Sequence, residues 1–233
     1  MEKWQRGARG QRGAGTMAND TRSRCRLCLV TPAGVDAGTF APRVVDALSG
    51  GDVASLIIAA SPADPAALQQ AAQAFVPIAQ DAGAAAIIHG DTRIVGRTRA
   101  DGVLIDSGLP DLAAALAALH PRGMVGADGG ASRHEAMAAG EASPDFLFFG
   151  HLDGDTGDGI FPRMLDLAAW WSEVTVIPAI VMGGRSLVSV REAAAEGIEF
   201  VALSRAVWDD PRGPRAAVEE ACEYLALSGE ATA

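Results

Sequence analysis

The chain has 233 residues, of which 49% are hydrophobic, and its formal net charge is −10. Nucleic-acid phosphates and anionic membrane surfaces repel an acidic protein, so the charge argues against both as the main partner and favours a small molecule. No run reaches the roughly 20 apolar residues of a membrane helix, and the N-terminus lacks the apolar core of a secretory signal, so we expect a cytoplasmic protein.

The first 24 residues are rich in glycine and arginine and have no apolar periodicity. This composition is typical of a flexible tail, and Met17 is a second candidate for the native start. No linker rich in proline, glycine or serine interrupts the apolar segments that follow. We therefore predict a flexible tail at 1–24, a single domain at 25–228 and a C-terminal tail at 229–233.

Eight apolar runs alternate with segments of helical periodicity. The predicted strands are Leu27–Thr31, Ala54–Ala59, Ala85–His89, Gly102–Asp106, Met124–Asp128, Phe146–Gly150, Pro178–Gly183 and Phe200–Ser204. The predicted helices are Phe40–Leu48, Pro65–Asp81, Thr92–Arg97, Leu112–Leu119, Ser132–Ala139, Arg163–Trp171, Leu187–Glu196 and Arg215–Leu227. Eight βα units can close on themselves, whereas an open doubly wound sheet of this length has about five to seven strands. The predicted fold class is therefore α/β, a (β/α)8 TIM barrel.

Three cysteines are too few for a disulfide framework. Cys25 and Cys28 lie three positions apart in an extended segment, so their side chains should point to opposite faces of the first strand. We interpret both as structural thiols.

The clearest functional signal follows the last two predicted strands. Gly183 and Gly184 come after strand seven, and Ser204 and Arg205 come after strand eight. TIM barrels carry their function where the strands end, and amide groups at these two ends form a cradle for phosphate. Arg185 or Arg205 would add a formal positive charge. The sequence predicts a small phosphorylated metabolite as ligand; the alternative is that the two glycines only make a tight turn.

Histidine and aspartate side chains follow strands three to six, namely His89, Asp91, Asp106, Asp128 and His151. Mg²⁺ usually takes one or two carboxylates and leaves its other positions to water and substrate phosphate, so Asp91 and Asp106 are the candidate metal ligands. His89, Asp128 and His151 are the candidate acid and base groups. The alternative for each aspartate is a helix N-cap or a residue that closes a loop.

Two further segments allow a structural prediction. The run DGDTGDG at 153–159 is the best candidate for a mobile loop over the site. Trp170 and Trp171 end a predicted helix and should pack against the barrel wall, whereas an exposed pair would mark the interface of a homo-oligomer.

Several motifs resemble those of the thiamine phosphate synthases in order and spacing. They are CLVT at 28–31, ADGV at 100–103, EAMAAG at 135–140, PDFLFFG at 144–150, IPAIVMGG at 177–184 and EFVALSRAVWDDP at 199–211. The resemblance covers about residues 26–225. It implies a barrel that joins a pyrimidine methyl diphosphate to a thiazole phosphate and releases diphosphate with the help of Mg²⁺.

The resemblance is strongest at the phosphate end of the barrel. Gly183 and Gly184 match the family's thiazole-phosphate glycines, Ser204 matches its serine after the last strand, and Gly150 matches its glycine after strand six. We therefore predict Gly150, Gly183, Gly184, Ser204 and Arg205 as the phosphate-binding residues.

The diphosphate half departs from the family pattern. A Gln-x-Arg-x-Lys run ends strand two in the family, where this chain has Leu56, Ile58 and Ala60. The family's Asn-Asp-Arg triplet after strand three falls at His89–Asp91. Cations that would hold a diphosphate are therefore missing. The nearest candidates to replace them are Arg93, Arg97 and Arg99.

Three functions stay open on this basis. The first is the coupling reaction of the family. The second is an isomerisation of the kind catalysed by the related thiazole tautomerase, which shares a Gly-His pair with Gly150-His151; its catalytic histidine falls at Gly130, so Asp128 or His151 would be the acid or base. The third is a barrel that binds a phosphometabolite without catalysis.

Overall fold

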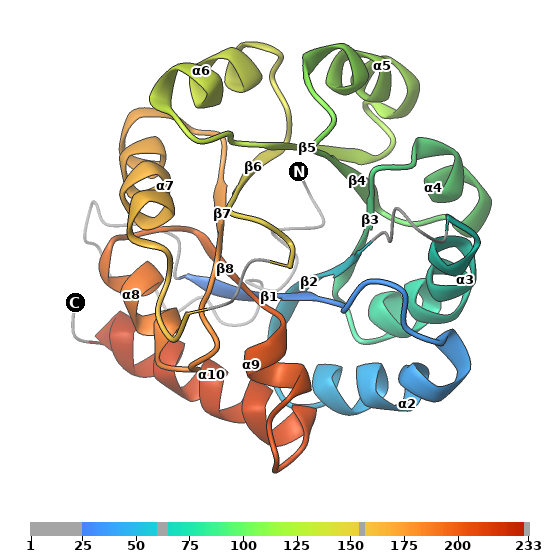
Figure 1. Ribbon diagram of the computed structural model, residues 1–233, viewed down its shortest axis with the longest axis vertical. Helices are drawn as coiled ribbons and strands as arrows, with labels where there is room; N and C mark the ends of the chain where they lie inside the picture. Colours follow the sequence, from blue (N-terminus) through green and yellow to red (C-terminus); the bar gives the residue numbers. More distant parts are fainter. Residues whose placement is uncertain (1–24, 60–64, 154–156, 231–233) are drawn as a thin grey trace, which may run out of the picture.

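The computed structural model describes residues 25–59, 65–153 and 157–230 (Figure 1). Eight strands form a closed barrel in which each strand pairs in parallel with the next, and β8 pairs with β1. The strands are β1 (Arg26–Val30), β2 (Val53–Ile58), β3 (Ala85–His89), β4 (Gly102–Ile105), β5 (Met124–Asp128), β6 (Phe146–Phe149), β7 (Ala179–Met182) and β8 (Phe200–Leu203). The predicted TIM barrel is confirmed. The tail predicted at 1–24 lies outside the described residues.

Helices cover the outside of the barrel (Figure 1). They are α2 (Ala37–Leu48), α3 (Pro65–Asp81), α4 (Thr92–Thr98), α5 (Leu109–Leu119), α6 (Arg133–Glu141), α7 (Pro162–Val174), α8 (Ser189–Ala195), α9 (Arg205–Trp208) and α10 (Pro214–Glu230). Each predicted helix is present, with ends that differ by a few residues. The short helix α9 was not predicted, because four residues are too few to show a helical period. The last helix continues past residue 228, where we expected the C-terminal tail to begin.

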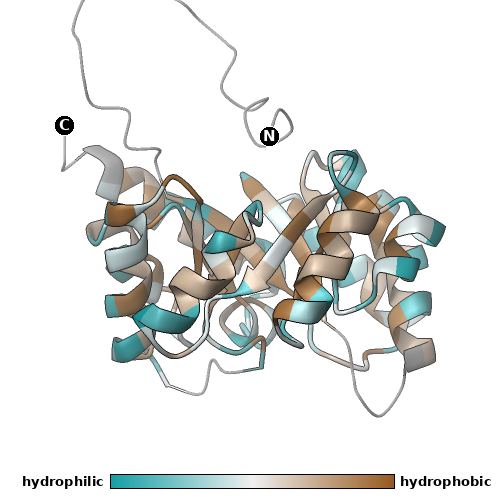
Figure 2. Ribbon diagram, turned by 90° about the horizontal axis from the view of Figure 1, so that it is seen from above, coloured by the Kyte–Doolittle hydropathy of each residue, from teal (hydrophilic) through white to brown (hydrophobic). Residues whose placement is uncertain are grey.

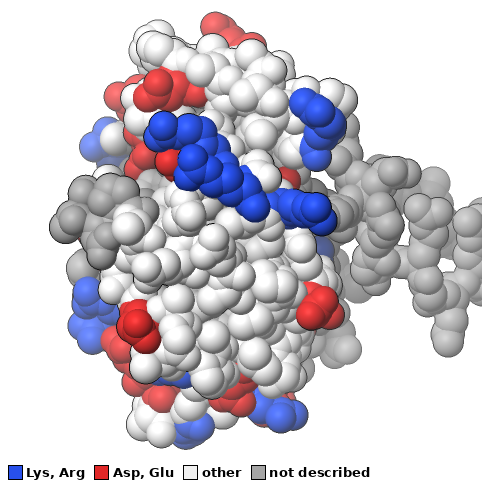
Figure 3. All heavy atoms as spheres, turned by 90° about the vertical axis from the view of Figure 1, so that its right-hand side faces the viewer, with Lys and Arg blue, Asp and Glu red and all other residues white. Residues whose placement is uncertain are grey.

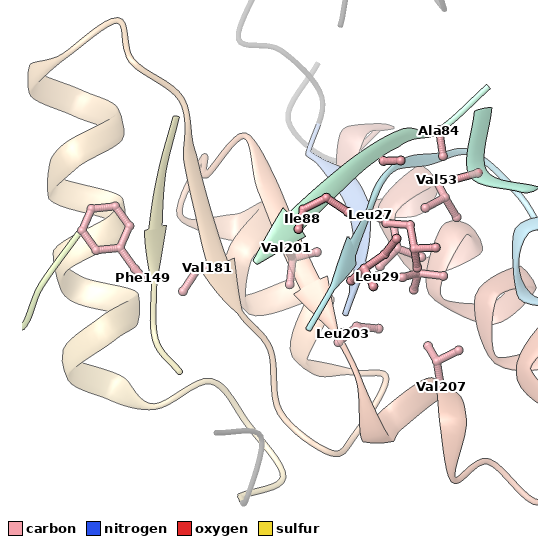
Figure 4. Close-up of a cluster of buried hydrophobic side chains, with 14 of the residues drawn as sticks. Leu27, Leu29, Val53, Ala84, Ile88, Phe149, Val181, Val201, Leu203 and Val207 are labelled. Carbon is pink, nitrogen blue, oxygen red and sulfur yellow. The ribbon is translucent and has the colours of Figure 1, made fainter. Parts of the chain in front are cut away.

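Two layers of apolar side chains form the core, because successive residues of a strand point to opposite faces. The inner layer fills the barrel and includes Phe146 and Phe148. The outer layer lies between the strands and the helices and includes Leu27, Leu29 and Val201 (Figure 4). In Figure 2, apolar residues concentrate on the strands and on the helix faces turned toward them. The barrel is therefore a packed body, and its accessible chemistry lies at the strand ends.

The first two cysteines follow this division. Cys28 belongs to the inner layer and Cys25 to the outer layer, as predicted from their spacing. Burial raises the pKa of both thiols, that of Cys28 to about 12. Both are therefore protonated and inert at neutral pH, which agrees with a structural role.

The tryptophan pair belongs to the barrel wall. Trp171 is 1% exposed, and its indole N–H donates to the carbonyl oxygen of Ile177 at 2.8 Å. The guanidinium of Arg133 lies 4.9 Å from the centre of the half-buried Trp170 ring. The packing interpretation is confirmed, and the homo-oligomer stays a prediction that this pair does not support.

Contacts after the last strand tie it to the first. The indole N–H of Trp208, on α9, donates to the carbonyl oxygen of Val30 at 2.6 Å. The hydroxyl oxygen of Thr31 accepts from the amide of Ala59 at 3.0 Å. These bonds hold the ends of β8, β1 and β2 in place at one rim of the barrel. Among the described helices, none combines the length and the apolar character needed to cross a membrane.

Two glycines test the packing of the inner layer. A Cβ atom at Gly126, on β5, would lie 2.1 Å from the Phe146 ring, whereas at Gly96, on α4, it would meet nothing within 4 Å. Gly126→Ala should lower the free energy of unfolding by about 1 to 3 kcal/mol, because the inner layer has no room for another carbon. Gly96→Ala should leave it unchanged or raise it by up to about 1 kcal/mol. Urea unfolding compares the two, and equal effects would contradict the packing.

Candidate functional site

An imidazole and a carboxylate pair directly at the mouth of the barrel. His89 ends β3, Asp106 follows β4, and His89 Nε2 lies 2.8 Å from Asp106 Oδ2. The histidine side chain is 17% exposed and the aspartate side chain 52%. The hydrogen bond with His89 holds the pKa of Asp106 below its usual value. Asp106 is therefore ionised and orients the imidazole, the arrangement in which a histidine can act as an acid or base.

Asp128, at the end of β5, joins this pair from the next strand. Desolvation raises the pKa of Asp128, and the Asp106 and Glu135 carboxylates raise it further. The amide of Gly130, which donates to Asp128 Oδ1 at 3.1 Å, and the neighbouring His151 lower it. The structure therefore brings together the three predicted acid and base groups, His89, Asp128 and His151. We refer to these three with Asp106 as the acid–imidazole cluster.

Asp91 has a different place from its predicted partner Asp106. Its Oδ1 accepts from the amides of Arg93 at 2.8 Å and Ile94 at 3.3 Å, and its Oδ2 lies 3.4 Å from the Arg93 guanidinium. Desolvation opposes ionisation, but these bonds hold the pKa of Asp91 below its usual value. Asp91 is thus the N-cap of α4, which was the alternative that the sequence left open.

The carboxylates do not form a metal cage. In the described part of the chain, no group of three or more histidine, cysteine, aspartate or glutamate side chains could hold a metal ion. Mg²⁺ needs only one or two carboxylates when substrate phosphates supply the rest. Asp106 fits that role better than Asp91, because Oδ1 of Asp91 accepts from two amides at the start of α4 and Oδ2 contacts the Arg93 guanidinium. The magnesium site stays a prediction.

Gly183 and Gly184 lie where the backbone is too crowded for a side chain. A Cβ atom at Gly183 would lie 2.6 Å from Leu203, and one at Gly184 would lie 2.1 Å from the carbonyl oxygen of Asp158. The Gly183 amide donates to the carbonyl of Ala202 at 2.8 Å. Both glycines are therefore required for close packing, and the tight-turn reading accounts for part of their role.

The amides after β7 are engaged within the protein. The Gly184 amide donates to Ser189 Oγ at 3.0 Å, the Arg185 amide to the carbonyl of Gly157 at 2.8 Å, and the Ser186 amide to the carbonyl of Asp158 at 3.1 Å. The segment 157–159 thus lies across the predicted phosphate cradle, as the loop prediction implied. Residues 154–156 of that loop lie outside the described residues. A phosphate that uses the Arg185 and Ser186 amides has to displace two carbonyl oxygens.

Helix α8 holds this segment in place through Glu192. Its Oε2 accepts from the amide of Ile160 at 2.8 Å, and a Cβ atom at Gly159 would lie 2.9 Å from its Oε1. Sequence reasoning missed Glu192, and it missed Glu135 beside Asp128. Both lie in ordinary helical patterns, so only the folded structure reveals their neighbours.

Ser204 and Arg205 lie at the start of α9, directly after β8. Ser204 is buried and is the N-cap residue of α9, and Arg205 lines a groove of about 340 Å³ together with Arg185 and Ser186. The loops after the last two strands and a short extra helix are the usual phosphate-binding elements of TIM barrels. The two arginines place formal positive charge at this end of the barrel, where Asp209, Asp210 and Glu220 also line the groove and Arg212 pairs with the last two.

Gly150 follows β6 with a φ of +117°, a conformation that favours glycine. A Cβ atom there would lie 2.7 Å from Met182 on β7. Gly150 therefore lies between the two ends of the site. It precedes His151 of the acid–imidazole cluster, and it packs against β7, the strand that leads to the phosphate end.

The orientation of β2 corrects one inference from the sequence, namely that Leu56 and Ile58 occupy the positions of the family's diphosphate-binding side chains. Leu56 and Ile58 belong to the outer layer under the helices, so they do not face the mouth. The side chains that β2 directs into the barrel are Ile57 and Ala59, and Ser55 lies opposite the inward-facing Cys28. The side chains at the inward positions of β2 are also uncharged, so this strand supplies no cation to bind a diphosphate. Ala60 lies outside the described residues.

The nearby arginines do not replace those cations. The side of the barrel covered by α3 and α4 carries a band of basic side chains across a surface with few other charges (Figure 3). Arg93, 80% exposed, pairs with Asp91, and Arg97 donates to the amide oxygen of Gln69 on α3 at 2.9 Å. Arg99 is the C-cap of α4, at the end of that helix away from the strand ends. Arg97 and Arg99 thus lie on the outside of the barrel.

A family model described as thiamine monophosphate synthase matches residues 27–207. A thiamine-phosphate synthase of Hyphomonas neptunium is 34% identical over 84% of this chain and 92% of its own length. A thiamine-phosphate synthase of Rhodospirillum centenum is 30% identical over 84% of this chain and 95% of its own. Among solved structures, thiamine phosphate pyrophosphorylase from Pyrococcus furiosus aligns with a TM-score of 0.70 and 20% identity, covering 90% of this chain and 99% of that one. That level of identity supports the fold alone.

Gly184→Ala tests the contact between the 157–159 segment and the cradle. The new methyl group would collide with Asp158, so the hydrogen bonds of the Arg185 and Ser186 amides should break. Exchange of these two amide hydrogens should become at least about tenfold faster. Gly157→Ala is the matched control, because the nearest atom to its Cβ lies 3.9 Å away. Unchanged exchange in Gly184→Ala would contradict the contact.

Asp106→Asn tests the electrostatics of the acid–imidazole cluster. Asp106 raises the pKa of Asp128, so its removal should lower that pKa, and Asp128 should then stay ionised to a lower pH. Asp111→Asn, in the first turn of α5, is the control and should leave the Asp128 titration unchanged. Carboxyl NMR titration measures both variants. An Asp128 pKa that rises in Asp106→Asn would disprove the coupling.

Proposed function

Because the chain belongs to the thiamine monophosphate synthase family, we propose that it couples a pyrimidine methyl diphosphate to a thiazole phosphate in thiamine biosynthesis. The chain matches 92%, 95% and 99% of the length of three relatives named thiamine-phosphate synthase, so the similarity extends over nearly all of each. The observation that carries the proposal is the division of one mouth into two chemically different ends. Glycines, a serine and arginines follow β7 and β8, and the acid–imidazole cluster follows β3 to β6.

The two ends suit the two charges that the reaction must handle. The bond between the methylene carbon and the diphosphate oxygen breaks and leaves a pyrimidine methyl cation, and the thiazole nitrogen donates its electron pair to that carbon. Carboxylates stabilise such a cation when they are fixed in place before the reaction. Asp106 is ionised and held by His89, and Asp128 lies beside it. The thiazole phosphate would bind at the opposite end, at Gly183, Gly184, Ser204 and Arg205, with Gly150 between the two ends.

Magnesium, when bound with the diphosphate, would neutralise the leaving group. Asp106 is the described carboxylate best placed to contact it, with Asp91 as the second predicted ligand. The inward side chains of β2 carry no cations, so a diphosphate here depends on the metal more than it would in a site with arginine and lysine. His89 would retain the hydrogen bond between Nε2 and Asp106, and as an imidazolium it would donate the Nδ1 proton to a departing phosphate oxygen.

A second candidate function rests on the same pair. A histidine 2.8 Å from an ionised aspartate, with a second aspartate of raised pKa nearby, is an arrangement that moves protons between atoms of one substrate. The cluster therefore also suits the isomerisation of a phosphorylated heterocycle, with Asp128 or His151 as the second group. Binding of a phosphometabolite without catalysis is the third outcome of the test below.

The test supplies purified protein with both thiamine precursors. We expect thiamine phosphate to form only when Mg²⁺ is present, and Asp106→Asn to lower kcat/KM by about 10- to 100-fold, because it removes a fixed charge at the developing cation. Asp111→Asn should retain full activity. Product formation is followed by liquid chromatography and mass spectrometry.

Absence of product would overturn the coupling reaction. If thiazole phosphate alone still raises the Tm, proton exchange into its ring in deuterated water separates the other two outcomes. Exchange that requires His89 would favour the isomerase, and stabilisation without exchange would favour a binding protein.

A further inference from the structure

A cleft between α5 and α6 opens beside the acid–imidazole cluster. The two helices flank β5 on the outside of the barrel (Figure 1), and a cavity of about 260 Å³ lies between them. Its floor is the outer side of β4 and β5, where Ile105 and Ala127 belong to the outer layer of the core. The cavity is therefore separate from the end formed by β7 and β8, and it shares Asp106 and Asp128 with the mouth of the barrel.

Small and apolar side chains create this space. Helix α6 presents Ala138 and Ala139 to it, and α5 presents Leu109 and Leu112. Leu109 is 48% exposed although it is a large apolar residue, so part of the wall lies open to solvent. Two alanines facing two leucines leave a gap that the helices do not close, and its walls favour an apolar body over water.

Carboxylates are the only ionisable side chains of the lining. Asp106, Asp128 and Glu135 belong to the lining residues, which contain no lysine, arginine or histidine. Asp106 pairs with His89 at 2.8 Å and Glu135 Oε2 accepts from the Ala131 amide at 2.7 Å, but the lining itself contributes three carboxylates and no cationic side chain. An anion would be repelled here, and a cation would be attracted.

We propose that the cleft between α5 and α6 binds a small organic cation with an apolar body about the size of one six-membered ring. An apolar cavity of roughly 150 Å³ holds benzene, so 260 Å³ accommodates a ring and a short charged substituent. The ring would lie against Leu112 and Ala138, and the charged group would lie toward Asp106 and Asp128.

This ligand differs from the phosphorylated substrates in both charge and position. β4 and β5 lie across the closed barrel from β8 and β1. An occupant of the cleft contacts Asp106 and Asp128 from the side of the helices, while a phosphate at Gly184 and Ser204 is held on the far rim. The proposal therefore does not depend on the coupling reaction, and it adds a site through which a cation can alter the carboxylates of that reaction.

Three compounds with a similar ring and different charges test whether the cleft selects its ligand by charge. Benzamidine carries a cation, benzoate an anion and benzyl alcohol no charge on a similar ring. We expect benzamidine to bind with a Kd at least about tenfold lower than that of benzoate, with benzyl alcohol between them. Calorimetry with the full chain at low ionic strength measures all three.

Two variants on α6 place the binding in the cleft. Ala138→Leu should weaken benzamidine binding by about tenfold or more, because its side chain fills the cavity. Met137→Ala is the control, since Met137 is 43% exposed and is not part of the lining. Glu135→Gln should weaken benzamidine binding without filling the cavity, so it tests the site even if Ala138→Leu folds poorly.

Equal affinity for benzamidine and benzoate would overturn the proposal, because the carboxylates would then select nothing. Benzamidine binding that survives both Ala138→Leu and Glu135→Gln would place the cation elsewhere and overturn it as well. Failure of the coupling assay leaves these results unaffected, since none of the probes is a substrate.

Discussion

β8 pairs with β1 in parallel, and this closure brings eight strand ends to one rim. Without it, β3 and β8 would lie at distant parts of an open sheet, and groups far apart in the chain would not face each other. The indole of Trp208 reinforces the closure by donating to the carbonyl of Val30 at 2.6 Å. The arginines after β7 and β8, the glycines before them and the acid–imidazole cluster all take their positions from this ring.

The site is divided by charge as a consequence. Carboxylates gather after β4 and β5, where Asp106 raises the pKa of Asp128 and the hydrogen bond with His89 lowers the pKa of Asp106. Arg185 and Arg205 lie at the other end, in a groove that Asp209, Asp210 and Glu220 also line. A substrate that carries a phosphate at one end and develops positive charge at the other fits this division. The same carboxylates also face the cleft between α5 and α6, where they have no cation among the lining residues.

Much of the fold could be predicted because its signals are local. Apolar runs predicted each strand to within about two residues of its ends, and α3 was predicted over its full length at Pro65–Asp81. The phase of β2 could not be predicted, since the run LIIA is apolar on both faces and the register shifts between Leu27 and Cys28. The contacts of Gly157 and Asp158 with the amides after β7 were also hidden, because they join segments distant in sequence. Convergence of His89, Asp106, Asp128 and His151 followed from the barrel itself.

The most direct test of this account is a crystal structure of the full chain with thiazole phosphate. We expect the phosphate between Gly184 and Ser204, with residues 157–159 displaced from the Arg185 and Ser186 amides or bridged to them by the phosphate. The heterocycle should then point toward the acid–imidazole cluster. A phosphate bound beside Asp106 and Asp128, or no density near Ser204 at saturating ligand, would contradict the division of the mouth into a phosphate end and a carboxylate end.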